Sequence, residues 1–270
     1  MKDEEYREPL SQEAFLGWLR REGSSRYHDH HPFHVLMHEG KLTKRLLQQW
    51  VLNRYYYQAR IPIKDALILS KSEDPAFRRI WIHRIHDHDG DQDAEGGLAS
   101  WLVLARGVGL DVEEVRSCRL VLPGVRLACD GYVQFVGEHS LLEGVASSLT
   151  ELFAPMLMAR RIEAWERHYP WIKAEALGYF RARISRASLD SKQAIDFVIR
   201  HATTYELQEQ CVRALTNKAD ILWHMLDCIY AAYVSPGRGL TGDRHDQPLS
   251  SIKSPPYFRG TALWSSSLWP

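Results

Sequence analysis

Apolar residues recur at intervals of three and four positions along most of this 270-residue chain. That spacing gathers them on one face of a helix, whereas a half-buried strand would alternate apolar and polar residues. No segment sustains such alternation. With 45% hydrophobic residues, the chain can bury one large core or two small ones. The sequence therefore predicts an all-α protein, built as a helical bundle without a sheet.

The composition changes near Ser235. Helical periodicity ends there, and the stretch SPGRGLTGDRHDQPLSSIKSPPYFRG is rich in Pro, Gly and Ser. Such a composition is typical of a poorly ordered segment. We therefore expect one helical domain over residues 1–234 and a tail over residues 235–270.

Cap and breaker residues give the expected helix boundaries. A long helix begins at Thr43, and Pro62 is expected to kink or end it. Another opens at Asp74-Pro75 and carries Arg84 and His88. The remaining helices are expected over residues 11–23, 96–104, from 111, and over 125–136, 141–169, 174–188, 191–215 and 218–233.

Charge and cysteine usage exclude several classes of protein. The formal net charge is +0, which gives no reason to expect a nucleic-acid or membrane partner. No run of residues reaches the apolar length of a membrane span. The four cysteines form no CxxC pair, and the charged start MKDEEYREPL does not resemble a secretory signal. We expect a cytoplasmic protein with free thiols.

The stretch IWIHRIHDHDGDQDAEGG places a cation beside a titratable side chain. Arg84 and His88 are four residues apart, so they share one face of a helix. Asp89 and Gly90 then end that helix. The pair is either an exposed polar helix end or part of a functional site in which His88 titrates near neutral pH.

Other helices carry the same mixture of Arg, Tyr and polar residues on their apolar faces. The groups are Arg54, Tyr57 and Gln58; Glu151, Met158 and Arg161; Tyr179 and Arg183; and Lys218, which is expected to open the last helix. Buried arginines need anions. Glu151 and Asp220 are candidate partners in a network of buried ion pairs. The alternative is a cavity inside the bundle that binds a small polycarboxylate, and the spacing does not decide between the two.

A histidine cluster lies in the stretch RYHDHHPFHVLMH. His34 and His38 have the i, i+4 spacing of a helical metal pair, and His28, His30 and His31 precede them. Metal sites in helical bundles usually add Glu-x-x-His pairs from other helices, and the long helices contain none. A role facing a ligand or capping a helix is therefore favoured over a metal site.

Eight segments, in order, resemble the PqqC family of pyrroloquinoline-quinone synthases. They are RYHDHHPFH, WVLNRYYYQ, IPIKDA, HRIHDHDG, LPGVR, SSLTELFAP, HYPWIKAEALGYFRAR and KADILWHMLD, between Tyr27 and Tyr233. The resemblance implies a single haem-oxygenase-like helical bundle, usually a homodimer. It also implies the last step of pyrroloquinoline quinone (PQQ) biosynthesis, in which the bicyclic precursor AHQQ is ring-closed and oxidised by O₂, releasing hydrogen peroxide. The family needs no metal or redox cofactor.

Matching the segments position by position implies the site residues. The residues implied to act in catalysis are His88, Tyr179, Arg183 and His28. Those implied to bind substrate or product are Tyr27, Arg54, Tyr57, Gln58, Arg84, Tyr132, Thr150, Glu151, Met158, Arg161 and Lys218. We interpret His88 as the base, kept neutral by the Arg84 cation beside it, and Tyr179 with Arg183 as stabilisers of a reduced oxygen species.

One position departs from the family, which has a histidine where this chain has Met158. A thioether neither donates a hydrogen bond nor titrates, so a protein that binds PQQ without turning over AHQQ is one alternative. A haem-oxygenase-like di-metal oxygenase with His and Asp/Glu ligands is another. A thiaminase-like activity is less favoured, because no cysteine falls on a matched pocket position.

Overall fold

The structure is a computed structural model that describes residues 7–235. The predicted tail lies outside the described residues, apart from Ser235. The elements are α1 (Gln12–Arg26), η1 (His28–His30), α2 (Pro32–His38), α3 (Lys44–Ser70), α4 (Pro75–Trp81), α5 (His83–Asp89), α6 (Gly97–Gly107), α7 (Val112–Ser117), α8 (Pro123–Glu138), α9 (Leu141–Ser147), η2 (Ser148–Phe153), α10 (Ala154–His168), η3 (Ala174–Leu177), α11 (Gly178–His201) and α12 (Tyr205–Tyr233).

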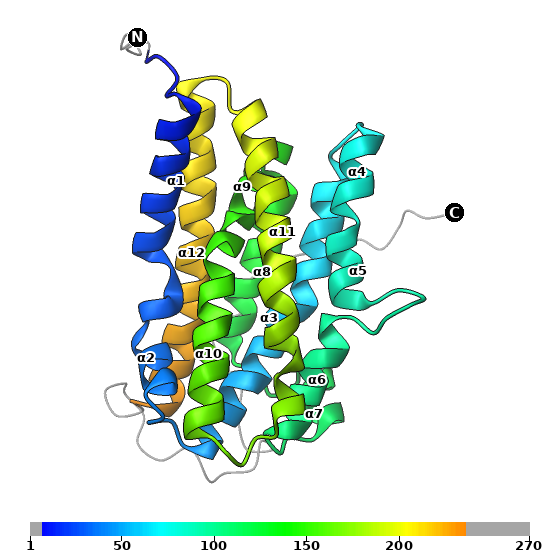
Figure 1. The fold of residues 1–270 in the computed structure, drawn as a ribbon, viewed down its shortest axis with the longest axis vertical. Helices are drawn as coiled ribbons and strands as arrows, with labels where there is room; N and C mark the ends of the chain where they lie inside the picture. The colour runs from blue at the N-terminus through cyan, green and yellow to red at the C-terminus, as the bar shows by residue number, and fades with distance from the viewer. Residues whose placement is uncertain (1–6, 236–270) are drawn as a thin grey trace, which may run out of the picture. The chain divides into compact units, whose positions relative to one another are not determined.

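Helices that are distant in sequence pack side by side (Figure 1). The last helix, α12, packs against α1, α8 and α9, while α3 packs against α8, α5 and α6. In front of them α10 pairs with α11. Within residues 7–235 no strand is formed, which confirms the all-α prediction.

Aromatic side chains fill the interior between four of the helices. The Trp50 ring centroid lies 5.5 Å from that of Trp101 and 5.9 Å from that of Trp165, and all three rings are fully buried. Phe180 packs against the same group. These large rings fix the distance between α3, α6, α10 and α11.

Several predicted helix boundaries are wrong, and of the two outcomes expected at Pro62 the end of the helix is excluded. Pro62 does not end α3, which continues to Ser70; the lost backbone hydrogen bond costs stability, but Pro62 is buried among the helices packed around α3. The expected breaks between residues 188 and 191 and between residues 215 and 218 are also absent. Lys218 lies in the middle of α12. The true start of α12 follows Thr204, whose side chain accepts a hydrogen bond from the Leu207 amide.

The helix expected over residues 141–169 is interrupted. The tighter turn of η2 separates α9 from α10 before Pro155. Contrary to the expectation from sequence, this stretch, Leu141–His168, is long and apolar enough to cross a membrane, but 56% of its most apolar window is buried inside the bundle. Burial of that kind is typical of a core helix in a soluble protein.

The loop between α5 and α6 is closed by glycines. Gly90 has φ of 92°, a conformation that favours glycine, as expected for the residue that ends α5. Gly96 approaches the backbone of the same turn so closely that an added Cβ would overlap the His88 carbonyl and the Gly90 nitrogen. The position of His88 therefore depends on a missing side chain at residue 96.

We predict that Gly96→Ala destabilises the protein by about 1–3 kcal/mol, the usual cost of overpacking, because backbone atoms cannot move aside as a side chain can. Gly131→Ala is the matched control, since a Cβ on this exposed glycine of α8 meets nothing within 4 Å. It should gain up to about 1 kcal/mol from helix propensity. Urea denaturation of both variants measures the difference, and equal stabilities would contradict the prediction.

Candidate active site

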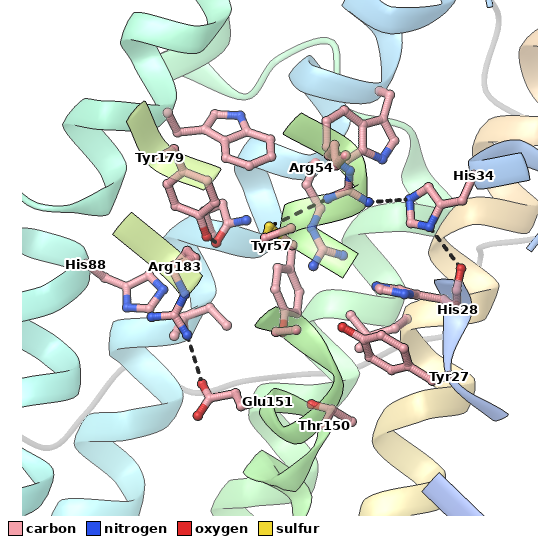
Figure 2. Close-up of a pocket in the computed structure, with 18 residues that line it drawn as sticks. Tyr27, His28, His34, Arg54, Tyr57, His88, Thr150, Glu151, Tyr179 and Arg183 are labelled. Atoms are coloured by element: carbon pink, nitrogen blue, oxygen red, sulfur yellow. Dashed lines mark hydrogen bonds and ion pairs between the residues drawn. The ribbon is translucent and has the colours of Figure 1, made fainter. Parts of the chain in front are cut away.

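A cavity inside the bundle brings together most of the residues predicted for the site (Figure 2). Of the predicted residues, all except Arg84, Tyr132 and Lys218 line it. The lining comprises Tyr27, His28, His34, Trp50, Arg54, Tyr57, Gln58, Ile61, His88, Trp101, Thr150, Glu151, Ala154, Met158, Arg161, Tyr179, Arg183 and Leu222. The polar faces that were expected on several separate helices therefore line one cavity together.

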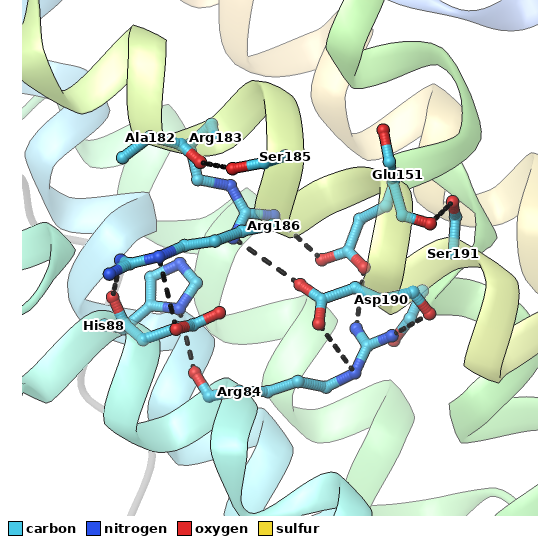
Figure 3. Close-up of polar contacts among 12 residues, drawn as sticks. Arg84, His88, Glu151, Ala182, Arg183, Ser185, Arg186, Asp190 and Ser191 are labelled. Carbon is cyan, nitrogen blue, oxygen red and sulfur yellow. Dashed lines mark hydrogen bonds and ion pairs between the residues drawn. The ribbon is translucent and has the colours of Figure 1, made fainter.

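Glu151 is the counter-charge of two arginines (Figure 3). Its Oε2 lies 2.7 Å from Nη1 of Arg84 and its Oε1 lies 3.4 Å from Nη2 of Arg183. Burial alone would raise the pKa of Glu151, but the two guanidinium groups outweigh it and hold that pKa at about 2. Of the two expected ion-pair partners, Glu151 is therefore confirmed.

Asp190 supplies the second carboxylate of this network. Its carboxylate lies 3.9 Å from Nε of Arg84 and 3.6 Å from Nη1 of Arg183, and its carbonyl accepts a hydrogen bond from Arg84. Burial and the charge of Glu151 raise its pKa to about 7. Asp190 was missed from sequence, although it follows Arg183 by seven residues on the same face of α11. The expectation that Asp220 pairs with a buried arginine is wrong, because Asp220 is exposed.

His88 has one ring nitrogen committed to its own helix. Nδ1 lies 3.0 Å from the Arg84 carbonyl, which can only accept, so Nδ1 carries the hydrogen and Nε2 keeps its lone pair. Burial, followed by the charge of Arg183, lowers the pKa of His88 to about 3. The imidazole is neutral as predicted. The cation responsible is Arg183, however, and not Arg84, whose charge is directed at Glu151.

Tyr179 lies one turn before Arg183 on α11 and lines the same cavity (Figure 2). Its hydroxyl donates to Oε1 of Gln58 at 2.9 Å, and its ring meets Trp101 edge to face at 4.8 Å. Burial raises the pKa of Tyr179 above its usual value. The phenol is therefore protonated at neutral pH, and it can donate a hydrogen bond to a bound species if Gln58 releases it.

Two lining arginines have no carboxylate partner among residues 7–235. Arg54 lies over the Tyr57 ring at 4.0 Å, and Arg161 lies over the Trp50 ring at 4.8 Å. Burial and the neighbouring Arg54 charge lower the pKa of Arg161 to about 9, which leaves it charged at pH 7. These two guanidinium groups are the positive charge that the cavity offers to a ligand.

Three predicted residues, Arg84, Tyr132 and Lys218, do not line the cavity. Arg84 is held by Glu151 and the main chain of Asp190. Lys218 lies 3.3 Å from the Tyr132 ring centroid and 4.2 Å from that of Tyr57, so aromatic rings separate its ammonium group from the cavity. Burial lowers the pKa of Lys218 well below its usual value.

The histidine cluster divides between the cavity and the surface of α12. His28 and His34 line the cavity, whereas His31 contacts Asp227 at 3.0 Å and caps α2 through its ring. Within the described chain, no three His, Cys, Asp or Glu side chains are grouped as a metal-binding set. No cysteine lines the cavity.

Solved structures with the same architecture share little sequence with this chain. A domain of unknown function with a haem-oxygenase-like fold from Shewanella denitrificans matches 83% of this chain and 94% of its own length, with a TM-score of 0.69 and 15% identity. A TenA homologue from Pseudomonas syringae matches 83% and 98%, with a TM-score of 0.65 and 15% identity. The fold is therefore haem-oxygenase-like.

Relatives with much higher identity cover nearly the same region. A pyrroloquinoline-quinone synthase of Acidiphilium cryptum is 52% identical over 84% of this chain and 93% of its own length. One from Rhizobium rhizogenes is 50% identical over 84% and 92%. The model of the TENA/THI-4/PQQC family matches residues 19–228. The chain belongs to the TENA/THI-4/PQQC family, and within it to the group of the pyrroloquinoline-quinone synthases that it resembles.

Proposed function

We propose that this protein is a pyrroloquinoline-quinone synthase, which closes a third ring on the bicyclic AHQQ and oxidises it with O₂ in the final step of PQQ biosynthesis. Relatives of about half identity carry that name. The observation that carries the proposal is a pair of arginines that line the cavity, the partly buried Arg54 and the buried Arg161, which have no carboxylate partner in the described chain.

The first role of the site is to hold a flat polycarboxylate. Guanidinium groups form two parallel hydrogen bonds to a carboxylate, and Arg54 and Arg161 are free to do so. Trp50, Trp101 and Tyr57 supply apolar ring surface in the same cavity. A planar quinone that carries several carboxylates satisfies both features.

The second role is proton removal, which we assign to His88. Ring closure and oxidation require C–H protons to leave, and the free lone pair on Nε2 of His88 is a suitable acceptor. Burial and the Arg183 charge lower the pKa of His88 to about 3. Carboxylates of a bound substrate add negative charge beside the imidazole and raise this pKa toward neutrality, so substrate binding itself activates the base.

The third role is the stabilisation of reduced oxygen. Arg183 shares the Glu151 carboxylate with Arg84 and so keeps part of its positive charge next to His88. The protonated Tyr179 can donate a hydrogen bond. His28 is kept neutral by burial and by Arg54 and Arg161, which lower its pKa well below the usual value. We propose that it accepts hydrogen bonds from the substrate rather than carrying charge.

Met158 leaves the positive charge of Arg161 in the cavity. Its sulfur lies 4.0 Å from Nη1 of Arg161, where a histidine ring would sit next to a cation. We propose that the contact of the family histidine is dispensable here and that the protein turns over AHQQ. We also propose that it works without a metal or redox cofactor and as a homodimer, as the resemblance to the PqqC family implies. We propose the cytoplasm as its location.

The arginine assignment predicts a loss of affinity. Arg161→Ala and Arg54→Ala should each weaken PQQ binding by about 1.5–3 kcal/mol, the usual value for a charged hydrogen bond. Arg160→Ala is the matched control, because Arg160 is the exposed neighbour of Arg161 on α10. Fluorescence titration with PQQ measures all three. Unchanged affinity in both cavity variants would remove the carboxylate-binding site from the proposal.

The base assignment predicts slow turnover with intact binding. His88→Ala should reduce the single-turnover rate with AHQQ by about 10²–10⁴-fold, as expected for the loss of a general base. PQQ affinity should change little, because the arginines remain. His83→Ala on the same helix is the control, since His83 is exposed. Normal turnover of His88→Ala would place the base elsewhere.

The cofactor assignment predicts indifference to chelation. Protein dialysed against a strong chelator should convert AHQQ to the PQQ chromophore at an unchanged rate while consuming O₂. Loss of turnover that iron or manganese restores would show a metal-dependent oxygenase instead. Binding of PQQ without any turnover of AHQQ would show a carrier.

A further inference from the structure

His34 has both ring nitrogens engaged in a way that fixes its tautomer. Nδ1 lies 2.9 Å from the carbonyl oxygen of His28, and Nε2 lies 3.2 Å from Nη2 of Arg161. A carbonyl only accepts and a guanidinium only donates, so Nδ1 carries the hydrogen and Nε2 accepts from Arg161. His34 is 1% exposed. Burial and the Arg161 charge lower its pKa well below the usual value, which is consistent with a neutral ring.

Arg161 has few other ways to be held. Along the described chain it pairs with no Asp or Glu, and its buried Nε has no hydrogen-bond partner. Nη1 meets only the Met158 sulfur, at 4.0 Å, and a thioether is a weak acceptor. The Trp50 and Phe180 rings lie beside its guanidinium group. The imidazole of His34 is therefore the strong acceptor that sets its direction.

We propose that His34 is a positioning residue, which aims Arg161 into the cavity through a neutral acceptor and so preserves the full charge of Arg161 for a ligand carboxylate. The inference rests on the proposed function, because it assigns to Arg161 the carboxylate of substrate and product. A carboxylate at position 34 would orient the guanidinium equally well but would offset its charge, as Glu151 does in part for Arg84 and Arg183.

The local structure is suited to a fixed acceptor. Pro32 opens α2, and His31 caps it by accepting from the Phe33 amide through Nδ1 at 3.0 Å. The helix packs against α10, which carries Arg161. His34 therefore approaches Arg161 from a short helix that is anchored at its start, with little freedom to withdraw.

The test uses three replacements at position 34 and PQQ as the probe. His34→Gln retains an amide oxygen that accepts from Arg161, and should bind PQQ within about threefold of the unchanged protein. His34→Leu loses the acceptor and should bind about tenfold more weakly, a typical effect of one hydrogen bond to a charged group. His34→Glu pairs with Arg161 and should bind about 100-fold more weakly. His38→Leu is the matched control, one turn along the same helix and outside the lining.

A second measurement separates positioning from general damage to the fold. If His34 acts through Arg161, the double variant His34→Leu/Arg161→Gln should bind PQQ as weakly as Arg161→Gln alone, within about threefold. In turnover of AHQQ, His34→Leu should raise KM about tenfold and change kcat less than about threefold. Thermal unfolding of each variant shows that it is folded.

The outcomes are distinct. If the protein without substitutions does not bind PQQ, the proposed function is overturned and this inference with it. Tight binding by the unchanged protein, with equal affinity in folded His34→Leu or in His34→Glu, would overturn the inference alone. Additive losses in the double variant would also overturn it, because His34 would then act independently of Arg161.

Discussion

Everything in this site depends on how an all-α bundle accommodates arginines in its interior. A buried guanidinium is strongly unfavourable without an anion or another partner. Glu151 resolves this for Arg84 and Arg183 together, with ion-pair distances of 2.7 and 3.4 Å. It stands on η2, the tight turn between α9 and α10. A regular helix through residues 148–153 would direct successive side chains differently, so the interruption of that helix belongs to the construction of the site.

Sequence spacing anticipated the parts of the site that lie on one helix face. Arg54, Tyr57 and Gln58 share a cavity wall because the i, i+3 and i+4 positions of a helix always do. Spacing also placed Arg84 and His88 on one face of a helix. It did not show that the two side chains contact different groups. Arg84 turns to Glu151, while His88 lines the cavity. That distinction depends on the other helices and cannot be read from one.

The incorrect predictions also concern features that depend on contacts between helices. Lys218 was expected to open a helix, yet it lies in the middle of α12, with its ammonium group over the rings of Tyr57 and Tyr132. Local propensity contains no information about such contacts. The cap at Thr204 was readable, since a threonine before a periodic run is a common start signal. Asp190 could be recognised as an ion-pair partner only after Arg183 was known to be buried.

The arginines of this site fall into two groups according to what holds them. Arg84 and Arg183 are paired with carboxylates, which stabilise the fold and leave only part of their charge for chemistry. Arg54 and Arg161 are held by ring faces and by one imidazole, which orient a guanidinium without neutralising it. Holding a cation in the interior without a carboxylate beside it is unfavourable. A carboxylate ligand relieves that cost when it binds, so part of the affinity for the ligand arises from the way the cavity holds these two arginines.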